Sequence, residues 1–452
     1  MTTRLDRRRF LQATSIAGFG ILVPGARGRS PNERLNFACI GVGGKGSSDT
    51  DHLGELGNIV ALCDIDEQRL GTKAEKFSDA KPYRDFRKLL DELSPKIDAV
   101  CVSTPDHTHA AAAVMAMRLG KHVYCQKPLA HSPGEARIMR ETAARMKVAT
   151  QMGNQGTSHP GFRSGIELIR SGVVGPVREV HVWTNRPFKY WKQAPDLVAR
   201  PETSPPVPPH VAWDLWLGPA PERPYQPVYH PHDWRGWWDF GTGALGDMAC
   251  HTANLPFMAL KLGLPTRVSA VSGAVNAETY PAWATITYEF PARGDLPPVK
   301  LTWYEGARDG KRHLPPSELF QGETPSSSGS LLVGEKGSIF SQSDYGADQL
   351  LLPAGRFEGK QPATTPDELK RQGRTTDADH KAEWVRAIRE GDPTIAWSNF
   401  GYAGTLTEAM LLGNVAVRLG ESIEFDADSG RVTNNPEAAR FIRPEYRSGW
   451  TL

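Results

Sequence analysis

The sequence has no apolar run long enough to cross a membrane, and it contains little cysteine. A membrane-spanning helix needs about 20 apolar residues, and the apolar N-terminal run from Ala13 to Val23 is shorter than that. The five cysteines are an odd number, and four of them fall within or at the end of strand-like runs. They therefore indicate small buried side chains rather than a disulfide framework.

Neither sign of charge dominates the composition. The chain has 53 Lys and Arg against 51 Asp and Glu, a net charge of +2. Residues 1–29 hold six arginines and one aspartate, so the remainder has 47 basic and 50 acidic residues, a net charge of −3. We therefore expect no nucleic-acid partner. His230 and His232 have no identifiable partner ligands, and no metal site is predicted.

The N-terminus resembles a twin-arginine export signal. Arg7, Arg8 and Arg9 precede Phe10 and the run of small and apolar residues that follows. We expect residues 1–33 to be this signal and a linker, the protein to be exported or periplasmic, and membrane contact to occur only through the signal. A chain without disulfides suits folding in the reducing cytoplasm before export. A basic amphipathic tail is the alternative.

A glycine-rich loop follows the first strand-like run, Leu35 to Ile40. Its glycines have the G-x-G-x-x-G spacing of a dinucleotide site, and Asp64 ends the next apolar run, where a carboxylate would accept hydrogen bonds from a ribose. Asp66 adds a second negative charge, which favours NAD over NADP, whereas Arg69 keeps NADP open. The cofactor residues predicted here are Gly41, Gly43, Gly44, Lys45, Gly46, Asp64 and Ile65.

The order of strand-like and helix-like segments predicts the fold. Strands and helices alternate from Leu35 to about Thr150, which predicts an α/β Rossmann domain (34–155) with a doubly wound parallel sheet. Alternating runs then predict an α+β domain (156–375) with a large, mostly antiparallel sheet. Helices in 376–452 are expected to pack back on the first domain. Half of the twelve tryptophans lie between Trp191 and Trp238, and loop packing and carbohydrate stacking explain this equally well.

Three further motifs complete a recognisable order. They are Ser103-Thr104-Pro105-Asp106-His107-Thr108-His109, Gly120 to Pro128, which ends in Gln126-Lys127-Pro128, and Gly241 to His251. With the glycine loop, they resemble the Gfo/Idh/MocA oxidoreductases, the family of glucose–fructose oxidoreductase and inositol dehydrogenase, over about residues 34–425. The resemblance implies a Rossmann domain, an open-faced sheet that mediates homo-oligomers, and a sugar or polyol substrate between them.

The resemblance also implies catalytic residues. Lys127 matches the lysine of the family's E-K-P motif, and Asp247 and His251 match its D-x-x-x-H pair. An alcohol loses hydride only as its proton is taken, so a lysine or histidine must reach that oxygen. Asp247 and His251 are four apart on one expected helix face, where the carboxylate can orient the imidazole. Two positions depart from the family pattern: Gln126 replaces glutamate and loses its charge, and Asp106 stands where many members have asparagine.

The remaining site residues follow from the same motifs. Further residues expected at the cofactor are Thr104, Pro105, His109, Gln126, Lys127, Asn154, Trp234 and Arg235. Residues expected at the substrate are Lys127, Arg186, Tyr190, Asp247 and His251.

These observations predict an NAD-dependent oxidoreductase that acts on a secondary hydroxyl of a sugar, polyol or glycoside. Because free NAD is scarce outside the cytoplasm, the cofactor is expected to be tightly bound. Two alternatives stay open. One is a redox-neutral, NAD-retaining glycoside hydrolase or lyase that oxidises, eliminates, adds water and returns the hydride. The other is a non-catalytic sugar-binding protein.

Overall fold

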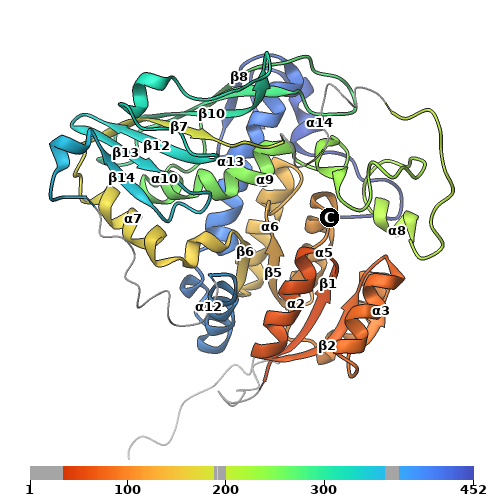
Figure 1. Ribbon diagram of the computed structural model, residues 1–452. Coiled ribbons are helices and arrows are strands. Elements are labelled where there is room, and N and C mark those ends of the chain that lie inside the picture. The colour runs from red at the N-terminus through yellow and green to blue at the C-terminus, as the bar shows by residue number, and fades with distance from the viewer. Residues whose placement is uncertain (1–33, 188–190, 192–199, 362–375) are drawn as a thin grey trace, which may run out of the picture. The chain divides into compact units, whose positions relative to one another are not determined.

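The described chain begins with a six-stranded parallel sheet (Figure 1). The computed structural model describes residues 34–187, 191, 200–361 and 376–452, so the predicted export segment and Tyr190 lie outside the described residues. The strand order β3-β2-β1-β4-β5-β6 confirms the predicted doubly wound sheet. The strands are β1 (Asn36–Ile40), β2 (Asn58–Cys63), β3 (Lys81–Tyr83), β4 (Ala99–Val102), β5 (His122–Gln126) and β6 (Thr150–Gly153). The helices between them are α2 (Lys45–Leu56), α3 (Glu67–Lys76), α4 (Phe86–Leu93), α5 (Asp106–Arg118) and α6 (Pro133–Met146).

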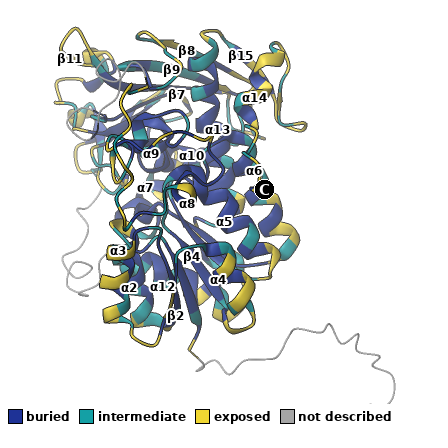
Figure 2. Cartoon of the chain, turned by 90° about the vertical axis from the view of Figure 1, so that its right-hand side faces the viewer, coloured by how far each residue is buried: buried dark blue, intermediate teal, exposed yellow. Residues whose placement is uncertain are grey.

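Local sequence explains where these elements begin. Parallel strands buried on both faces read as apolar runs, and β4 is buried along its whole length. Helix α3 begins where the Asp66 carboxylate accepts hydrogen bonds from the first backbone amides. Ser132 and Glu135 form a capping box at the start of α6. Figure 2 shows the strands and α5 in the buried colour, whereas α2, α3 and α4 carry exposed residues.

The second sheet is larger and mostly antiparallel, as predicted. Its order is β14-β13-β12-β7-β10-β9-β8-β15-β16, with β11 paired to β10, and only β7 and β10 run parallel among its described pairs. Its strands are β7 (Val177–Trp183), β8 (Arg267–Ser272), β9 (Trp283–Phe290), β10 (Val299–Arg308), β11 (Lys311–Arg312), β12 (Gly329–Gly334), β13 (Gly337–Ser341), β14 (Gln349–Leu352), β15 (Ile423–Asp426) and β16 (Arg431–Val432).

Helices fill the space between the two sheets. Strand β9 alternates, and its buried residues face α13 (Phe400–Leu419), where the Tyr288 hydroxyl donates to the Met410 carbonyl at 2.7 Å. Helix α13 also contacts α6 and α9 (Gly243–Thr252), so it links the parallel sheet to the second sheet. The other helices of this part are α7 (Pro160–Arg170), α8 (Trp213–Leu217), α10 (Asn254–Ala259) and α14 (Ala439–Ile442).

Helix α12 (Thr376–Glu390) packs against the parallel sheet although it lies more than 200 residues after it in sequence. The fully buried Trp384 contacts the rings of Phe37 and Tyr124 at centroid distances of 5.9 and 5.7 Å. Its indole N–H also donates to the Ala149 carbonyl at 3.1 Å. The domain boundaries at 155 and 375 stay predictions.

Most elements of the first sheet were predicted, and some were missed. The sequence predicts strands at 36–40 and 99–102 and a helix at 133–146, and these are the bounds of β1, β4 and α6. Strand β3 was not predicted because Lys81–Tyr83 is short and polar, and α4 was not predicted either. All five cysteines are buried and free, as expected. Within the described ranges, no helix has both the length and the apolar character that a membrane span requires.

Candidate active site

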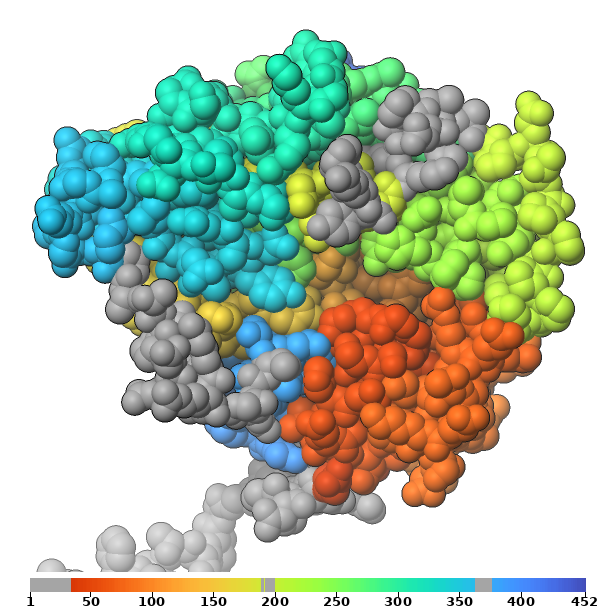
Figure 3. All heavy atoms as spheres, in the orientation of Figure 1, coloured from red at the N-terminus to blue at the C-terminus, as the bar shows by residue number. Residues whose placement is uncertain are grey.

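A cavity of about 440 Å³ lies at the carboxyl ends of β1, β2, β4 and β5. Its opposite wall comes from α8, the short 3₁₀ helix Asp233–Gly236 and α9. Figure 3 shows the surface hollowed between the red segment that contains α2 and the green segments of the second half. The predicted site residues that line this cavity are Gly41, Gly43, Gly44, Lys45, Asp64, Ile65, Thr104, Pro105, Gln126, Lys127, Trp234, Arg235 and Asp247.

The glycine loop is shaped so that side chains are excluded from it. A Cβ atom on Gly46 would lie 1.8 Å from the Gly41 carbonyl oxygen. Gly41 has a φ of 78°, and a Cβ there would lie 2.6 Å from the Ser103 carbonyl oxygen. Helix α2 begins with Gly44 as its cap, and no side chain caps its first amides. These amides are therefore available to an anion.

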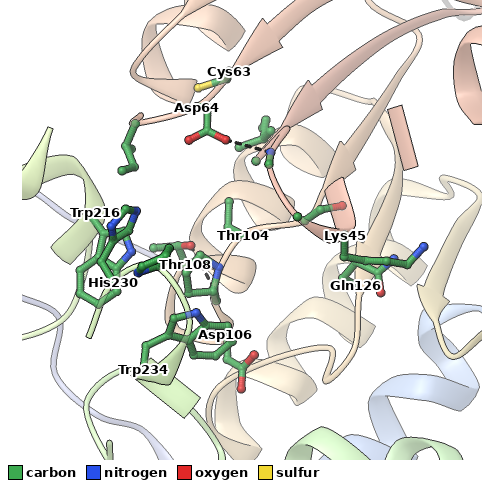
Figure 4. Close-up of a pocket in the computed structure, with 18 of the residues that line it drawn as sticks. Lys45, Cys63, Asp64, Thr104, Asp106, Thr108, Gln126, Trp216, His230 and Trp234 are labelled. Carbon is green, nitrogen blue, oxygen red and sulfur yellow. Dashed lines mark hydrogen bonds between the residues drawn. The ribbon is translucent and has the colours of Figure 1, made fainter. Parts of the chain in front are cut away.

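Asp64 and Thr104 supply polar atoms on either side of this loop. The Asp64 carboxylate accepts hydrogen bonds from the Val42 and Gly43 amides at 2.9 and 3.2 Å and from the Asp66 amide at 3.0 Å. Figure 4 shows it pointing at the loop. Burial raises its pKa. The buried Thr104 hydroxyl has no hydrogen-bond partner among the described residues. The loop, a carboxylate for a ribose and an unpaired hydroxyl together fit a dinucleotide.

Asp66 caps helix α3 and does not line the cavity, so its expected role in cofactor choice stays a prediction. Its carboxylate accepts from the Gln68 and Arg69 amides at the start of α3, and the residue is 5% exposed. It is absent from the cavity wall, where Arg69 and Arg84 lie instead. The pattern of an aspartate directly before a helix could have identified this cap.

Lys127 and Asp247 form an ion pair in the cavity wall. The Lys127 ammonium, just after β5, donates to the Asp247 carboxylate at 2.6 Å and to its backbone carbonyl at 2.8 Å. The Arg235 guanidinium lies 3.6 Å from the same carboxylate oxygen. Burial alone would raise the pKa of Asp247, but the Lys127 and Arg235 cations outweigh it and lower this pKa to about 2. Asp247 therefore stays charged at neutral pH.

His251 does not take the partner that its spacing suggested. It lies one turn after Asp247 on α9, but the described hydrogen bonds of the Asp247 carboxylate go to Lys127. The His251 ring packs 5.0 Å from that of Tyr345, and its Nδ1 atom has no partner among the described residues. Burial lowers its pKa to about 3, and the nearby cations of Lys127 and Arg186 act in the same direction. His251 is therefore a neutral imidazole, and Tyr345 is a neighbour that sequence did not indicate.

Other predicted residues lie behind the cavity wall. The ring nitrogens of His109 lie 2.8 Å from the carbonyls of Pro128 and Thr104, so this side chain joins two loops at the site. Asn154 is fully buried, accepts from the Ser398 hydroxyl, and donates to the Cys250 carbonyl at 3.4 Å. Neither residue lines the cavity.

Gln126 lacks the negative charge of the family's glutamate, and Asp49 on the neighbouring helix α2 carries one. The Gln126 amide donates at 2.8 Å to Asp49 of α2, a fully buried carboxylate. Asp49 also pairs with Lys45 and Lys381, each at 2.8 Å. Burial would raise the pKa of Asp49, but these two lysines outweigh it and lower the pKa. Asp377 bonds both lysines as well. Sequence patterns do not indicate this cluster, because Lys45 and Asp377 are 332 residues apart.

The tryptophan-rich stretch packs mainly on itself. Trp216, Tyr229, Trp237 and Phe240 belong to one buried aromatic cluster, so loop packing accounts for most of the stretch. Only its edge reaches the cavity, where Trp216 and Trp234 lie in the wall beside His230 (Figure 4). Across the described residues, no cluster of three or more His, Cys, Asp or Glu side chains could hold a metal ion.

Asp106 predicts a pH dependence of stability. Its carboxylate accepts from the Thr242 amide and hydroxyl at 3.1 and 2.6 Å, and burial raises its pKa from the usual 3.8 to about 7. The folded chain therefore holds a proton that the unfolded chain loses, and this stabilisation disappears as pH rises from about 4 to about 7. Asp106→Asn keeps the acceptor and cannot ionise. At pH 7.5 we expect its free energy of unfolding to exceed that of the parent by on the order of 3 kcal/mol, so it should unfold at a higher temperature. At pH 5 the difference should be smaller. Equal differences at both pH values in thermal melts would contradict this.

The Gln126 and Asp49 pair allows a reciprocal exchange. Gln126→Glu places a second carboxylate against Asp49 and should lower the free energy of unfolding by about 3 kcal/mol. Adding Asp49→Asn restores a pair of one amide donor, at position 49, and one carboxylate, at position 126. The double variant should recover at least half of the lost free energy of unfolding. Urea unfolding of both single variants and of the double variant measures the coupling, with Gln126→Met as the uncharged control. Additive losses in the double variant would show that the two side chains do not interact.

The chain matches family models along more than half of its length. Residues 35–154 match an oxidoreductase family model for an NAD-binding Rossmann fold, and residues 162–294 match one for the C-terminal alpha/beta domain. An inositol 2-dehydrogenase of Salmonella paratyphi B is 30% identical over 155 residues, which cover 32% of this chain and 45% of that protein. The chain thus spans less than half the length of this curated relative.

Solved structures share the fold at low identity. The WlbA dehydrogenase from Bordetella pertussis, in complex with NADH and UDP-GlcNAcA, has a TM-score of 0.60 at 15% identity, over 87% of this chain and 99% of that one. A levoglucosan dehydrogenase in complex with NADH and levoglucosan has a TM-score of 0.56 at 16% identity, over 87% and 99%. With its two sheets and both family models matched in order, the chain belongs to the Gfo/Idh/MocA family of oxidoreductases.

Proposed function

We propose that this protein is an NAD-dependent oxidoreductase that oxidises a secondary hydroxyl of a sugar, polyol or glycoside, with hydride passing from the carbon that bears the hydroxyl to the nicotinamide. The observation that carries the proposal is the Lys127 and Asp247 ion pair, which lies in the same cavity wall as the glycine loop. A proton-transfer group and a dinucleotide loop in one cavity are what hydride transfer from an alcohol requires.

The chain's own residues would bind the dinucleotide and favour NAD. The loop from Gly41 to Gly46 and the start of α2 offer backbone amides to the pyrophosphate, and Asp64 offers a carboxylate to the ribose. When bound, NAD supplies the hydride acceptor. The Asp64 carboxylate would repel a 2′-phosphate, whereas Arg69 and Arg84 in the same wall would attract one. Arg69 lies against Gly43 of the loop. We place Asp64 first because its carboxylate is fixed at the loop by hydrogen bonds from two of its amides.

Lys127 is the proposed proton-transfer group. As the ammonium, Lys127 directs two of its three N–H donors at Asp247 and leaves the third for a substrate oxygen. As the neutral amine, it keeps those two donors on Asp247 and presents its lone pair to the substrate hydroxyl. In the oxidation direction the neutral amine takes the hydroxyl proton, and in the reduction direction the ammonium returns it. Asp247, which remains ionised, holds the amine in place and stabilises its protonated form. His251, neutral and on the same helix, is the second group that could meet the substrate.

A carbohydrate-like substrate is supported by the relatives and by the wall of the cavity. The similar proteins are dehydrogenases of inositol and of sugar-like compounds by their names. The indole of Trp234 offers apolar surface to a sugar ring in the same wall as Lys127 and Arg235. Arg186, near enough to His251 to lower its pKa, is the proposed further substrate contact.

Export, retention of the cofactor and oligomer formation belong to the same proposal. The arginine run at positions 7–9 supports export by the twin-arginine route, and export of a folded protein favours a retained NAD. A homo-oligomer formed through the second sheet is proposed from the family to which the chain belongs. Cell fractionation tests the first point and light scattering of the purified protein tests the last.

Replacing Lys127 tests the proposed activity. A panel of free sugars, polyols and glycosides is incubated with NAD, and NADH and products are measured together. Lys127→Met keeps the bulk of the side chain but cannot accept a proton, so kcat should fall by about 10²-fold or more, with NAD affinity little changed. Lys88→Met, at an exposed lysine of α4, is the matched control and should keep full activity.

Three results would contradict this account in different ways. Activity of Lys127→Met within twofold of the parent removes Lys127 from the mechanism. Glycoside cleavage without net NADH by the parent indicates a redox-neutral glycosidase instead of a dehydrogenase. Tight sugar binding without turnover indicates a binding protein.

A further inference from the structure

Part of the cavity wall is formed by residues that lie outside the strands of the parallel sheet. Phe86, the first residue of α4, lines this part with Leu215 and Trp216 of α8 and with Trp450 near the C-terminus. In dinucleotide-binding folds the acid after the second strand holds the adenosine ribose. On the proposed function, the end near Phe86 and Trp450 therefore belongs to the adenosine half of the cofactor.

The C-terminal tail is fastened to the segment that contains α8. The Arg447 guanidinium donates to the Asp214 carboxylate at 2.7 Å, to the Asp214 carbonyl at 2.6 Å and to the Gly218 carbonyl at 2.5 Å. The Arg447 amide donates to the Pro219 carbonyl at 3.2 Å, and the Trp450 amide donates to the Arg447 carbonyl at 3.2 Å. Figures 1 and 2 both place the C-terminus beside α5. The tail thus turns back at Arg447 and brings Trp450 to the cavity.

Trp450 is held in the wall rather than on the open surface. It is 8% exposed, its ring lies 5.9 Å from that of Phe86, and the Arg87 guanidinium lies 4.2 Å from its centroid. Arg87 also donates to the Gly449 carbonyl at 3.3 Å. The tail therefore contacts helix α4 of the first domain on one side and the segment that contains α8 on the other.

A second cavity lies on the other side of Trp450. It has a volume of about 310 Å³, and Phe86 and Trp450 are the residues that line both this cavity and the larger one. Its other residues include Ala111 and Val114 of α5. Phe86 and Trp450 therefore separate the adenosine end of the main cavity from this second cavity.

We propose that Trp450 is a cofactor-binding residue that packs against the adenine of the bound dinucleotide and slows its release. This inference rests on the proposed function. An indole has a large, flat, apolar face, which suits a purine base. Removing the indole would take away that face and join the two cavities, so the adenosine end would open. Because affinity changes between related complexes appear mainly in dissociation rates, the effect should be found in release of the cofactor.

The release rate of NADH from the full chain tests this role. The protein is loaded with NADH, chased with excess NAD, and followed by energy transfer from tryptophan to bound NADH. Trp216 and Trp234 remain in the cavity wall as donors in every variant. Trp450→Ala should release NADH at least about 10-fold faster than the parent, the size expected for loss of one base–aromatic contact. Trp397→Ala removes an indole that is 37% exposed and absent from both cavities, and it should release NADH at the parent rate.

Arg447→Ala is the second variant, and it keeps the indole. It removes the three hydrogen bonds that the Arg447 guanidinium makes to the α8 segment. NADH release should therefore again be faster than in the parent, and this variant decides the question if Trp450→Ala does not fold. Parent rates in the folded variants overturn the role of Trp450 while leaving the dinucleotide site in place. If the parent itself shows no saturable energy transfer, the proposed function fails together with this inference.

Discussion

The ion pair between Lys127 and Asp247 is the constraint on which the site depends. It joins the carboxyl end of β5 to α9, 120 residues further along the chain, and so fixes one wall of the cavity against the other. Taking two charges out of water is costly unless they are well paired. Here the carboxylate also lies beside Arg235, and the lysine uses only two of its three donors on Asp247. The pair therefore holds Lys127, the proposed proton-transfer group, in place and leaves it a free donor.

A second set of charges lies behind the glycine loop, with Asp49 and Lys381 buried and Lys45 exposed. Asp49, Lys45 and Lys381 join α2, which presents its first amides to the cavity, to α12, which covers the parallel sheet. Gln126 completes this cluster as a neutral donor to Asp49. A glutamate at that position would meet an existing carboxylate, so the departure at Gln126 and the presence of Asp49 have one electrostatic explanation. Gln126 thus contacts Asp49 of α2, and Lys127 contacts Asp247 of α9.

Short-range patterns predicted what depends on neighbouring residues. The glycine loop, the bounds of β4 and α6, and the positions of Lys127 and Asp247 follow from local spacing and from the order of motifs. The pairing of Asp49 with Lys381, and the packing of Trp450 beside Phe86, depend on contacts between residues more than 300 positions apart, which no local pattern encodes. The cap formed by Asp66 was not expected, because an aspartate after a strand can be a helix cap as well as a negative charge near the cofactor. The four-residue spacing paired His251 with Asp247 in the prediction. Spacing along one helix cannot show that a lysine distant in sequence forms the ion pair with that carboxylate.

Equilibrium titration of the full chain with NADH and NADPH, followed by energy transfer from tryptophan, tests most directly that this cavity holds a dinucleotide. The account predicts saturable binding of NADH, weaker binding of NADPH, and a loss of at least about 10-fold in NADH affinity in Asp64→Ala, since a hydrogen bond to a charged group contributes about 1.5–3 kcal/mol. Absence of saturable binding, or equal NADH affinity in the parent and in Asp64→Ala, would contradict it.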